Sequence, residues 1–495
     1  MKRILATIFF AGLNLIVYCQ QIGWYHKDLE KDTVFGVSTE KAYQELLRNK
    51  RPQKVIVGII DSGIDTAHED LRPVLWTEEK TGIHGWNYIG RETGKEDITE
   101  LVGDRKDFYD SLSFTVVPEI YRAGFQQHRA LAPTLSQKKQ AMQVFIENLE
   151  EVKSWTVELE KKLNKTDLIV DDFRNYKPSQ ENEKIWVSLI IERFKMYKNW
   201  EELKFTEIDN LIEKAQYHLL HGLNISNGEL DTTTGDSNIN PDALGLVSPV
   251  NPTPLHGTHV AGIIGAKRNN GVGLEGIADN VQLMMLKANG NIRELRDKSL
   301  AKGIRFAVDH GATIINLSFG KPYTWDKKSV DEAIAYGRKK NVLFIHAAGN
   351  AAENLDVLPH YPSPKEKDNW IEVGASGLVD DKTLPARFSN YGKKSVDVFA
   401  PGVQIYSSIP GSKYEFESGT SMAAPVVTGI ATLIKEYYPS LSAVQIKEII
   451  LKTVIKRDVL SDKCISGGVV NAYNALQLAA TYKKDILVKG KRTLR

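Results

Sequence analysis

Three short segments, each rich in glycine and other small residues, carry one chemically reactive side chain apiece. They are IIDSGID around Asp61, HGTHVAG from His256 and GTSMAAP around Ser421. A serine hydroxyl is a weak nucleophile at neutral pH and needs an adjacent base to take its proton. An imidazole can be that base, and a carboxylate can hold the imidazole in one tautomer and stabilise its protonated form. The three segments therefore predict nucleophilic catalysis with Asp61, Ser421 and a histidine of HGTHVAG, either His256 or His259, as the candidate catalytic residues.

The chain around Asp61 predicts the fold class. A continuous apolar run from Val55 to Ile60 leads into Asp61 and is typical of a strand buried in a parallel sheet. The runs 313–317 and 342–345 predict two further central strands. Because strands alternate with helical patterns, we expect an α/β fold: a doubly wound, mostly parallel sheet with helices on both faces, plus a helical insertion. Asp61 would then lie at the carboxyl end of its strand, where such sheets place their sites.

The other two reactive residues are expected at the starts of helices. Apolar residues follow His256 at the spacing of one buried helix face. Ser421 opens a segment of small residues that can pack closely on a sheet, and Pro425 is expected in the first turn of that helix, where a missing N–H costs little. Ser442 and Gln445 form a capping box that predicts a final amphipathic helix.

Together these motifs resemble those of the subtilisin-like serine peptidases, or subtilases, in which Asp, His and Ser occur in this order. The resemblance implies a subtilisin-like fold and hydrolysis of peptide bonds. It also implies that His256 is the base and that His259 packs behind it, whereas the residues alone leave His259 as an alternative base. The segment AAGN at 347–350 resembles the oxyanion-hole motif of the family. This resemblance implies that the Asn350 side chain and the Ser421 backbone N–H donate hydrogen bonds to the attacked oxygen, on which negative charge develops.

The resemblance extends to the substrate groove, where an extended peptide pairs with a backbone edge before cleavage. The segments 318–320 and 289–291 resemble that edge, and 347–349 would line the opposite wall of the pocket for the side chain before the scissile bond. His360 would approach the floor of this pocket if the segment His-Tyr-Pro aligns with its counterpart in the family. The predicted substrate-binding residues are Ser318, Phe319, Gly320, Ala348 and Gly349.

A structural calcium ion is a further expectation, although the chemistry itself requires no cofactor. The segment 268–274 matches a family loop that wraps Ca²⁺, and Asp70 matches the carboxylate that completes the site. Asp70 and Asn270 are therefore the candidate metal ligands, because hard cations take oxygen ligands. The alternative is an ordinary Asn-Gly turn at Asn270 with Asp70 as a cap.

The chain departs from the family between Asp61 and His256, where typical subtilases have only a few tens of residues. The additional residues fall at about 105–235 and show helical periodicity in three stretches, 142–163, 187–197 and 208–219. Pro178-Ser179 predicts the start of the middle helix, and Thr206 with Asp209 resembles a capping pair before the last. The insert either enlarges the fold or acts as a cap or exosite beside the groove.

The first 19 residues are typical of a signal peptide. Lys2 and Arg3 precede an apolar run from Ile4 to Tyr18, which is too short for a membrane span. Lipidation of Cys19 is the alternative, which the bulky residue before it disfavours. No later segment is apolar over about eighteen residues, so we expect no transmembrane helix. Two cysteines are too few for a disulfide framework.

The segment between the signal peptide and Asp61 is too short for the folded pro-domain typical of secreted subtilisins. We expect it to lie across the catalytic domain as an anchoring arm through Trp24, Tyr25, Leu29 and Val34. The expected organisation is a signal peptide at 1–19, an arm at 20–54, a discontinuous peptidase domain at 55–104 and 236–480, the insert at 105–235 and a basic tail at 481–495.

The sequence as a whole predicts an exported serine endopeptidase, periplasmic or extracellular, that acts through an acyl-enzyme intermediate. Its expected partners are protein or peptide substrates, and a net charge of +2 gives no reason to expect nucleic acid. The oligomeric state is not indicated. Two alternatives remain open: a processing peptidase of narrow specificity, and a non-catalytic peptide-binding protein on the same scaffold.

Overall fold

The computed structural model describes residues 22–88, 119–194, 199–209, 212, 215–216, 254–288, 297–321, 324 and 326–492. Two units make up the chain: the body, which comprises Ile22–Glu151 and Asn210–Arg495, and the helical unit, which contains Val152–Asp209. The predictions for the signal peptide at 1–19, for Cys19 and for the edge segment 289–291 lie outside the described residues.

A nine-stranded sheet forms the centre of the body in the described part of the chain, in the order β10-β11-β7-β6-β5-β4-β1-β3-β2. Neighbouring strands pair in parallel except β10 and β11, which are antiparallel. Strands β8 (Ile405–Ile409) and β9 (Lys413–Glu417) form a separate antiparallel hairpin. The strands of the sheet are β1 (Val55–Asp61), β2 (Gly85–Asn87), β3 (Val281–Lys287), β4 (Ile314–Leu317), β5 (Leu343–Ala347), β6 (Trp370–Ser376), β7 (Val398–Pro401), β10 (Ile455–Lys456) and β11 (Gly468–Val469).

Strand β1 lies in the middle of the sheet, with β3 on one side and β4 on the other. All of its residues except the half-buried Ile56 are buried, which is why its sequence is a continuous apolar run rather than an alternation. The predicted strands at 55–60, 313–317 and 342–345 correspond to β1, β4 and β5. These predictions are confirmed, as is the doubly wound, mostly parallel α/β fold.

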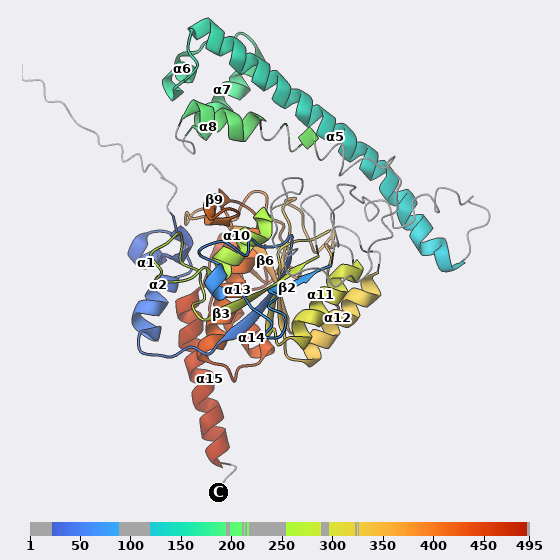
Figure 1. Cartoon of the computed structure of the whole chain (residues 1–495), viewed down its shortest axis with the longest axis vertical. Coiled ribbons are helices and arrows are strands. Elements are labelled where there is room, and N and C mark those ends of the chain that lie inside the picture. Colours follow the sequence, from blue (N-terminus) through green and yellow to red (C-terminus); the bar gives the residue numbers. More distant parts are fainter. Residues whose placement is uncertain are drawn as a thin grey trace, which may run out of the picture. The chain divides into compact units, whose positions relative to one another are not determined.

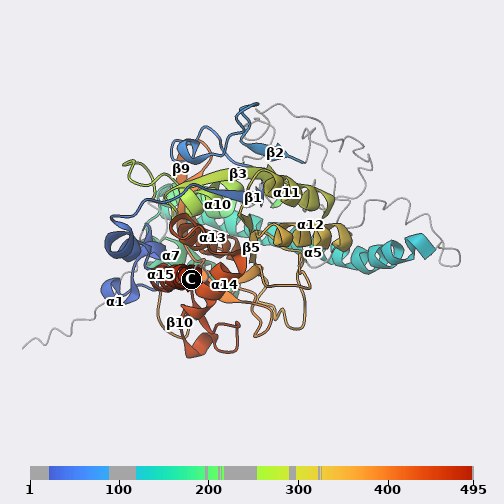
Figure 2. The same cartoon turned by 90° about the horizontal axis from the view of Figure 1, so that it is seen from below.

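Helices cover both faces of the sheet, as Figures 1 and 2 show. One face packs in a cluster that includes Val57 and Ile59 with the helices α10, α13, α14 and α15. The other face packs in a cluster that includes Ile60 and Met284 with the helices α11 and α12. These helices are α10 (Leu255–Gly265), α11 (Asp297–Asp309), α12 (Lys327–Lys339), α13 (Thr420–Tyr437), α14 (Ala443–Lys452) and α15 (Ala472–Arg492), with short 3-10 turns at Arg72–Val74 and Asp458–Leu460.

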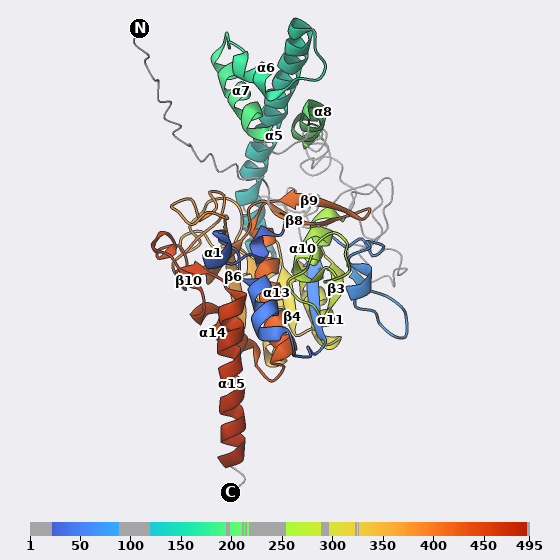
Figure 3. The same ribbon diagram turned by 90° about the vertical axis from the view of Figure 1, so that its left-hand side faces the viewer.

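The N-terminal arm is buried against the body. It contains the turn Trp24–His26, α1 (Leu29–Asp32), α2 (Thr39–Ala42) and a π-helical turn at Tyr43–Leu47. Trp24 is 2% exposed and its Nε1 donates to the carbonyl of Gln404 at 2.9 Å. Figure 3 shows this segment, in blue, beside the red C-terminal helices, where Ala472 N–H donates to the Val37 carbonyl. The described part of this segment is therefore held against the body by buried side chains and by hydrogen bonds to distant parts of the chain.

The helix starts agree with prediction at two of three positions. His256 is the second residue of α10, and Ser442 and Gln445 form the capping box of α14. Pro425 is different: α13 begins at Thr420, so the proline lies in the second turn rather than the first. The sequence prediction was wrong because it placed the helix start too late.

The helical unit has a core of its own. Its elements are the part of α5 (Glu119–Leu163) from Val152 onward, α6 (Val170–Asn175), α7 (Glu181–Arg193), α8 (Trp200–Lys204) and a π-helical turn, η4 (Phe205–Asp209). Trp200 is fully buried and its Nε1 donates to Glu160 Oε1 at 2.6 Å, which ties α8 to α5. The core consists of Trp155, Leu159, Leu168, Phe173, Val187, Ile190, Trp200 and Leu203.

The helices predicted at 142–163 and 187–197 correspond to α5 and α7. The helix predicted at 208–219 overlaps only the end of η4, and most of it lies outside the described residues. The predicted start near Ser179 is confirmed, since the Ser179 N–H and hydroxyl both donate to Glu183 in the first turn of α7. The cap predicted at Thr206 is wrong. A helical segment already begins at Trp200 and continues into η4, so Thr206 lies inside that segment rather than at a helix start.

Among the residues described, the structure contains no helix with the length and apolar character that crossing a membrane requires. Cys464 is a free, buried thiol.

Candidate active site

The topology brings the motif segments to one edge of the sheet. Asp61 is the last residue of β1, Ser318 follows β4, and Asn350 lies three residues after β5 ends. Because these strands are parallel neighbours, their carboxyl ends meet at the same edge. The strand order also reverses at β1, which is where doubly wound sheets form their sites.

Asp61 and His256 form a hydrogen-bonded pair. His256 Nδ1 is 2.7 Å from Asp61 Oδ1, although the two residues lie 195 positions apart in the chain. The carboxylate is 1% exposed and also accepts the Ser62 N–H at 2.7 Å. The imidazole, in contrast, is 38% exposed. This arrangement directs the Nδ1 proton to Asp61 and leaves Nε2 as the nitrogen that can accept a proton.

The two histidines of HGTHVAG have opposite electrostatic surroundings. Desolvation lowers the pKa of His256, but the charge of Asp61 and its hydrogen bond raise it by more, with a contribution from Glu417, so the net shift is upward. Burial lowers the pKa of His259 to about 3, and its Nε2 lies 3.2 Å from the Glu415 carbonyl oxygen. His259 is therefore a neutral, packed side chain, and His256 is the histidine with the properties of a base.

Ser421 lies in the first turn of α13, and its hydroxyl donates to the Ser318 carbonyl at 2.9 Å. To act as the predicted nucleophile, this hydroxyl must turn from the Ser318 carbonyl toward His256 Nε2 by rotation about the Cα–Cβ bond, which has three staggered positions. Catalytic hydrogen bonds of this kind commonly form only when substrate is present.

Pro425 has a structural consequence for the same segment. A proline has no N–H to donate to the carbonyl four residues earlier, which is that of Ser421. The Ser318 hydroxyl takes its place and donates to this carbonyl at 2.9 Å. Ser318 is itself held by Asn316, whose Nδ2 donates to the Ser318 hydroxyl at 2.8 Å. Two reciprocal bonds thus join the segment after β4 to the start of α13.

The Asn350 amide is oriented by Thr420. Its Oδ1 accepts the Thr420 backbone N–H at 2.8 Å and the Thr420 hydroxyl at 3.0 Å, so the NH₂ end points away from Thr420. A Cβ placed on Gly419 would lie 3.4 Å from Asn350 Nδ2 and 3.6 Å from the Ser421 nitrogen. Both predicted oxyanion donors therefore border the same small space, which Gly419 keeps open.

Two of the predicted substrate-binding residues, Gly320 and Gly349, lie close to His360. Gly320 and Gly349 both approach His360: a Cβ on Gly320 would lie 3.5 Å from its Nδ1, and a Cβ on Gly349 would lie 3.0 Å from the same atom. Gly349 has φ of +103°, which an L side chain rarely adopts. The segment that contains Gly320 is joined to the segment that contains His360, because Lys321 and Tyr361 exchange backbone hydrogen bonds. The predicted approach of His360 to these two glycines agrees with this geometry.

Sequence reasoning overlooked three residues of this region. Thr420 orients Asn350, as described above. Asn390 Nδ2 donates to the Ala348 carbonyl and its Oδ1 accepts two backbone N–H groups from the turn after Gly349. His346, on β5, pairs with Glu372 on β6. Only Thr420 carried a signal in the sequence, because it belongs to the GTS motif.

The candidate calcium ligands are also brought together. Asn270 Nδ2 donates to Asp70 Oδ1 at 2.6 Å, and the Leu274 N–H donates to Asp70 Oδ2 at 3.1 Å. Asn270 Oδ1 accepts the Val272 N–H at 3.0 Å, which fixes the orientation of the amide. Calcium takes oxygen ligands, whereas both Asp70 oxygens face N–H donors here. This donor set fits a self-contained turn better than a calcium cage, and calcium binding stays a prediction.

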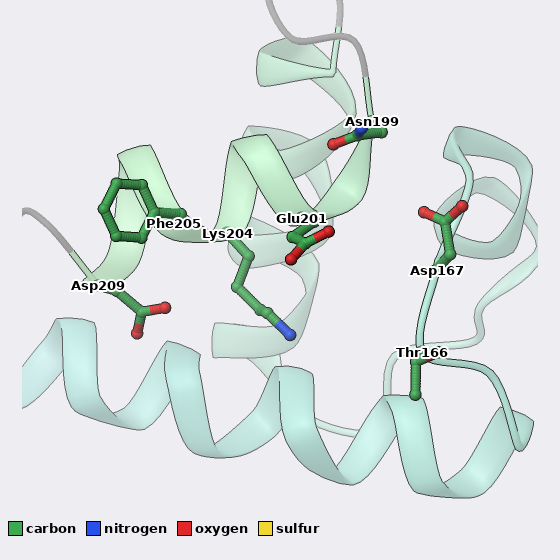
Figure 4. A pocket seen from close by; sticks show the side chains of 7 residues that line it. All are labelled: Thr166, Asp167, Asn199, Glu201, Lys204, Phe205 and Asp209. Carbon is green, nitrogen blue, oxygen red and sulfur yellow. The ribbon is translucent and has the colours of Figure 1, made fainter.

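The helical unit contains a polar hollow of its own. Figure 4 shows Lys204 and three carboxylates around it, from Asp167, Glu201 and Asp209. Lys204 Nζ pairs with Glu160 at 2.8 Å and Lys153 Nζ pairs with Asp209 at 2.7 Å. The hollow contains none of the predicted catalytic residues.

Comparisons with known proteins agree with this geometry. A family model described as the subtilase family matches residues 52–477. The chain is similar to subtilisin DY of Bacillus licheniformis, with 34% identity over 276 residues that cover 54% of this chain and 95% of that protein. It is also similar to the thermophilic serine proteinase of Bacillus sp. (strain AK1), with 36% identity over 228 residues, 45% of this chain and 52% of that protein.

A third relative is thermitase of Thermoactinomyces vulgaris, with 37% identity over 222 residues, 45% of this chain and 75% of that protein. The chain therefore spans about half the length of the Bacillus sp. proteinase and more of the other two. Among solved structures, it is similar to a mutant of the protease domain of PatA, with 28% identity, a TM-score of 0.41, and coverage of 47% of this chain and 82% of that one.

Proposed function

The chain belongs to the subtilase family of serine endopeptidases, and we propose that it is an exported enzyme that hydrolyses peptide bonds in proteins through an acyl-enzyme intermediate. The observation that carries the proposal is the 2.7 Å pair of His256 and Asp61 at the sheet edge where Ser421 and Asn350 also lie. A base with an orienting carboxylate, a hydroxyl nucleophile and an amide donor are the components that acyl transfer requires.

In the proposed mechanism, the Ser421 hydroxyl leaves the Ser318 carbonyl, donates to His256 Nε2 and attacks the substrate carbonyl carbon. His256 takes the proton while Asp61 stabilises the imidazolium. The Asn350 amide and the Ser421 N–H donate to the oxyanion. His256 then protonates the leaving amine, and a water molecule, activated by the same base, hydrolyses the acyl-enzyme and restores the Ser421 hydroxyl.

The proposed export is supported by the N-terminal sequence, in which Lys2 and Arg3 precede the apolar run Ile4–Tyr18. Intact-mass analysis of the protein recovered outside the cytoplasm tests it. Cleavage close to Cys19 is expected. A mature chain that begins with a lipidated Cys19 would instead support membrane anchoring.

Purified protein and its Ser421→Ala variant, incubated with casein, test the proposed activity. The wild type should release peptides and react covalently with a fluorophosphonate at Ser421, and the variant should do neither. Equal peptide release by both proteins would refute the assignment of Ser421. A protein that binds peptides without fluorophosphonate labelling would be a binding protein. Cleavage of a few sequences in a peptide library would indicate a processing peptidase.

A further inference from the structure

Two buried imidazole nitrogens beside the predicted substrate pocket have no hydrogen-bond partner among the described residues: His346 Nε2 and His360 Nδ1. His346 is fully buried on β5, directly opposite Glu372 on β6, and its Nδ1 lies 2.8 Å from Glu372 Oε1. Glu372 Oε2 accepts the Trp370 Nε1–H at 2.9 Å, which holds the carboxylate in place. The His346 ring is thus fixed with Nε2 directed away from Glu372.

His360 has a matching arrangement from a different segment. Its Nε2 lies 3.3 Å from Glu353 Oε2, and its side chain is 13% exposed. In each ring, therefore, one nitrogen faces a glutamate and the other is unpaired. A buried polar atom without a hydrogen-bond partner costs free energy. A bound ligand that donates a hydrogen bond to each of the two nitrogens would remove this cost.

The two unpaired nitrogens converge on one place. A Cβ built on Gly320 would lie 3.5 Å from His360 Nδ1 and 3.7 Å from His346 Nε2. Both atoms therefore border the space beside the α-carbon of a glycine predicted to bind substrate. Gly349, on the opposite wall, approaches His360 Nδ1 to 3.0 Å by the same measure. Gly320 and Gly349 contribute no side chain between the predicted pocket and these two buried nitrogens.

The positions of the ring protons determine whether the two unpaired nitrogens can accept or donate hydrogen bonds. Each imidazole directs a proton to its glutamate, so in the neutral ring the unpaired nitrogen is a hydrogen-bond acceptor. Burial lowers the pKa of His360, with His346 adding to the effect and Glu353 opposing it, which favours the neutral ring at neutral pH.

The nearest charges are the carboxylates of Glu353 and Glu372. Other charged side chains close by are paired with one another: Asp397 with Lys447 at 2.8 Å, and Lys321 with Asp297 at 2.9 Å. The pocket thus combines two acceptors with an excess of negative charge.

We propose that His346 and His360 determine the cleavage specificity of this enzyme by binding a lysine or arginine side chain immediately before the scissile bond. Such a side chain supplies the N–H donors that both nitrogens lack and the positive charge that Glu353 and Glu372 favour. An acidic side chain would meet acceptors and negative charge, and an aliphatic one would leave both nitrogens unpaired. The inference rests on the proposed peptidase function.

Peptide substrates that differ only in the residue before the cleaved bond test the proposal. With the wild-type enzyme, kcat/KM should be at least about tenfold higher for lysine or arginine than for leucine, glutamine or glutamate, a ratio that corresponds to about 1.4 kcal/mol. His360→Leu and His346→Leu should each reduce the lysine-to-leucine ratio about tenfold. This ratio is measured within one preparation and does not depend on the fraction of folded enzyme.

His310→Gln is the matched control, because His310 follows α11 at the opposite edge of the sheet, where it stacks on Phe306. It should leave the ratio unchanged. Cleavage after leucine, glutamine or glutamate at a rate equal to that after lysine would overturn the inference. Fluorophosphonate labelling of Ser421 in the same preparations separates this outcome from failure of the proposed function, since labelling requires no side chain in the pocket.

Discussion

Thr420 determines which end of the Asn350 amide faces the oxyanion space. A backbone N–H can only donate, so the atom of Asn350 that lies 2.8 Å from the Thr420 nitrogen must be the oxygen. The NH₂ group is consequently directed to the space beside Gly419 and the Ser421 nitrogen. The predicted oxyanion donor is therefore already oriented by Thr420, and orientation in advance is what makes such a donor effective.

Asn350→Ala should lower kcat by roughly a hundred- to a thousandfold with little change in KM, because the amide acts on the charge of the transition state. Steady-state kinetics on a peptide substrate measure this effect. Thr420→Val is the matched control: it removes the hydroxyl contact at 3.0 Å but keeps the backbone N–H. The decrease in kcat caused by Thr420→Val should be clearly smaller than that caused by Asn350→Ala. Equal losses in the two variants would mean that orientation, and not donation, accounts for the effect of Asn350.

Glu436 is a buried carboxyl group whose pKa is raised well above its usual value of 4.5 by burial and by the neighbouring Asp279. The folded state therefore favours its protonated form. As pH rises past 4.5, the unfolded chain ionises before the folded one, so folding stability falls until the folded-state pKa is passed. Glu436→Gln mimics the neutral form and should remove this dependence.

Thermal unfolding at pH 8 should show a Tm at least about 2 °C higher for Glu436→Gln than for wild type. At pH 4 the two proteins should unfold at nearly the same temperature, since the wild-type carboxyl is then protonated in both states. Glu332→Gln, on the exposed face of α12, controls for loss of one charge. A Tm increase of the same size at pH 4 would contradict the titration argument.

At the scale of elements, the turn at 269–274 is joined to the segment before η3 (Arg72–Val74) by one buried carboxylate. Asp70 accepts hydrogen bonds from Asn270 and Leu274, both of which lie in this turn. Asp70→Ala should therefore destabilise the body by about 2 kcal/mol, because two N–H donors lose a charged acceptor. Chemical denaturation in the presence of EDTA measures the difference.

Calcium titration of the same two proteins tests the metal prediction separately. A ligand that binds only the folded state raises Tm as its concentration rises. The internal hydrogen bonds of the turn predict that Asp70→Ala is destabilised already in EDTA. A loss that appears only when wild type is supplied with calcium would show that the turn is a calcium site and that its hydrogen bonds are secondary.

The elements also show what sequence could and could not predict. Buried parallel strands such as β1 are continuous apolar runs, so the sheet and the position of Asp61 could be predicted from local pattern. The pair of His346 and Glu372 could not, because it depends on the register of β5 against β6. The predicted position of Pro425 within α13 was wrong, because the helix begins at Thr420. The Thr420 N–H is bonded to Asn350, a contact between distant parts of the chain that local sequence does not reveal.

At the scale of the whole molecule, the helical unit is separable from the body in its packing. Its core residues, among them Trp155, Phe173 and Trp200, contact one another in a cluster distinct from the clusters of the body. The body in turn has its own clusters on both faces of the sheet. Because each unit buries its own apolar surface, removal of the helical unit should leave the sheet and the predicted catalytic residues folded.

Deletion of residues 105–235, with a short flexible linker in their place, tests this separability and the role of the insert. The insert is attached between Asp61 and His256 in the chain, so we expect it to limit access of large substrates. The deletion protein should cleave small peptides at the wild-type rate and folded proteins several times faster.

Circular dichroism and fluorophosphonate labelling establish that the deletion protein is folded and retains a reactive Ser421. These controls matter because an unfolded deletion protein would lose all activity for a trivial reason. A folded, labelled protein that no longer cleaves small peptides would show that the insert forms part of the substrate site. Unchanged rates on both substrate classes would show that it only enlarges the fold. The steric role requires the selective gain on folded proteins, since only a barrier distinguishes substrates by size.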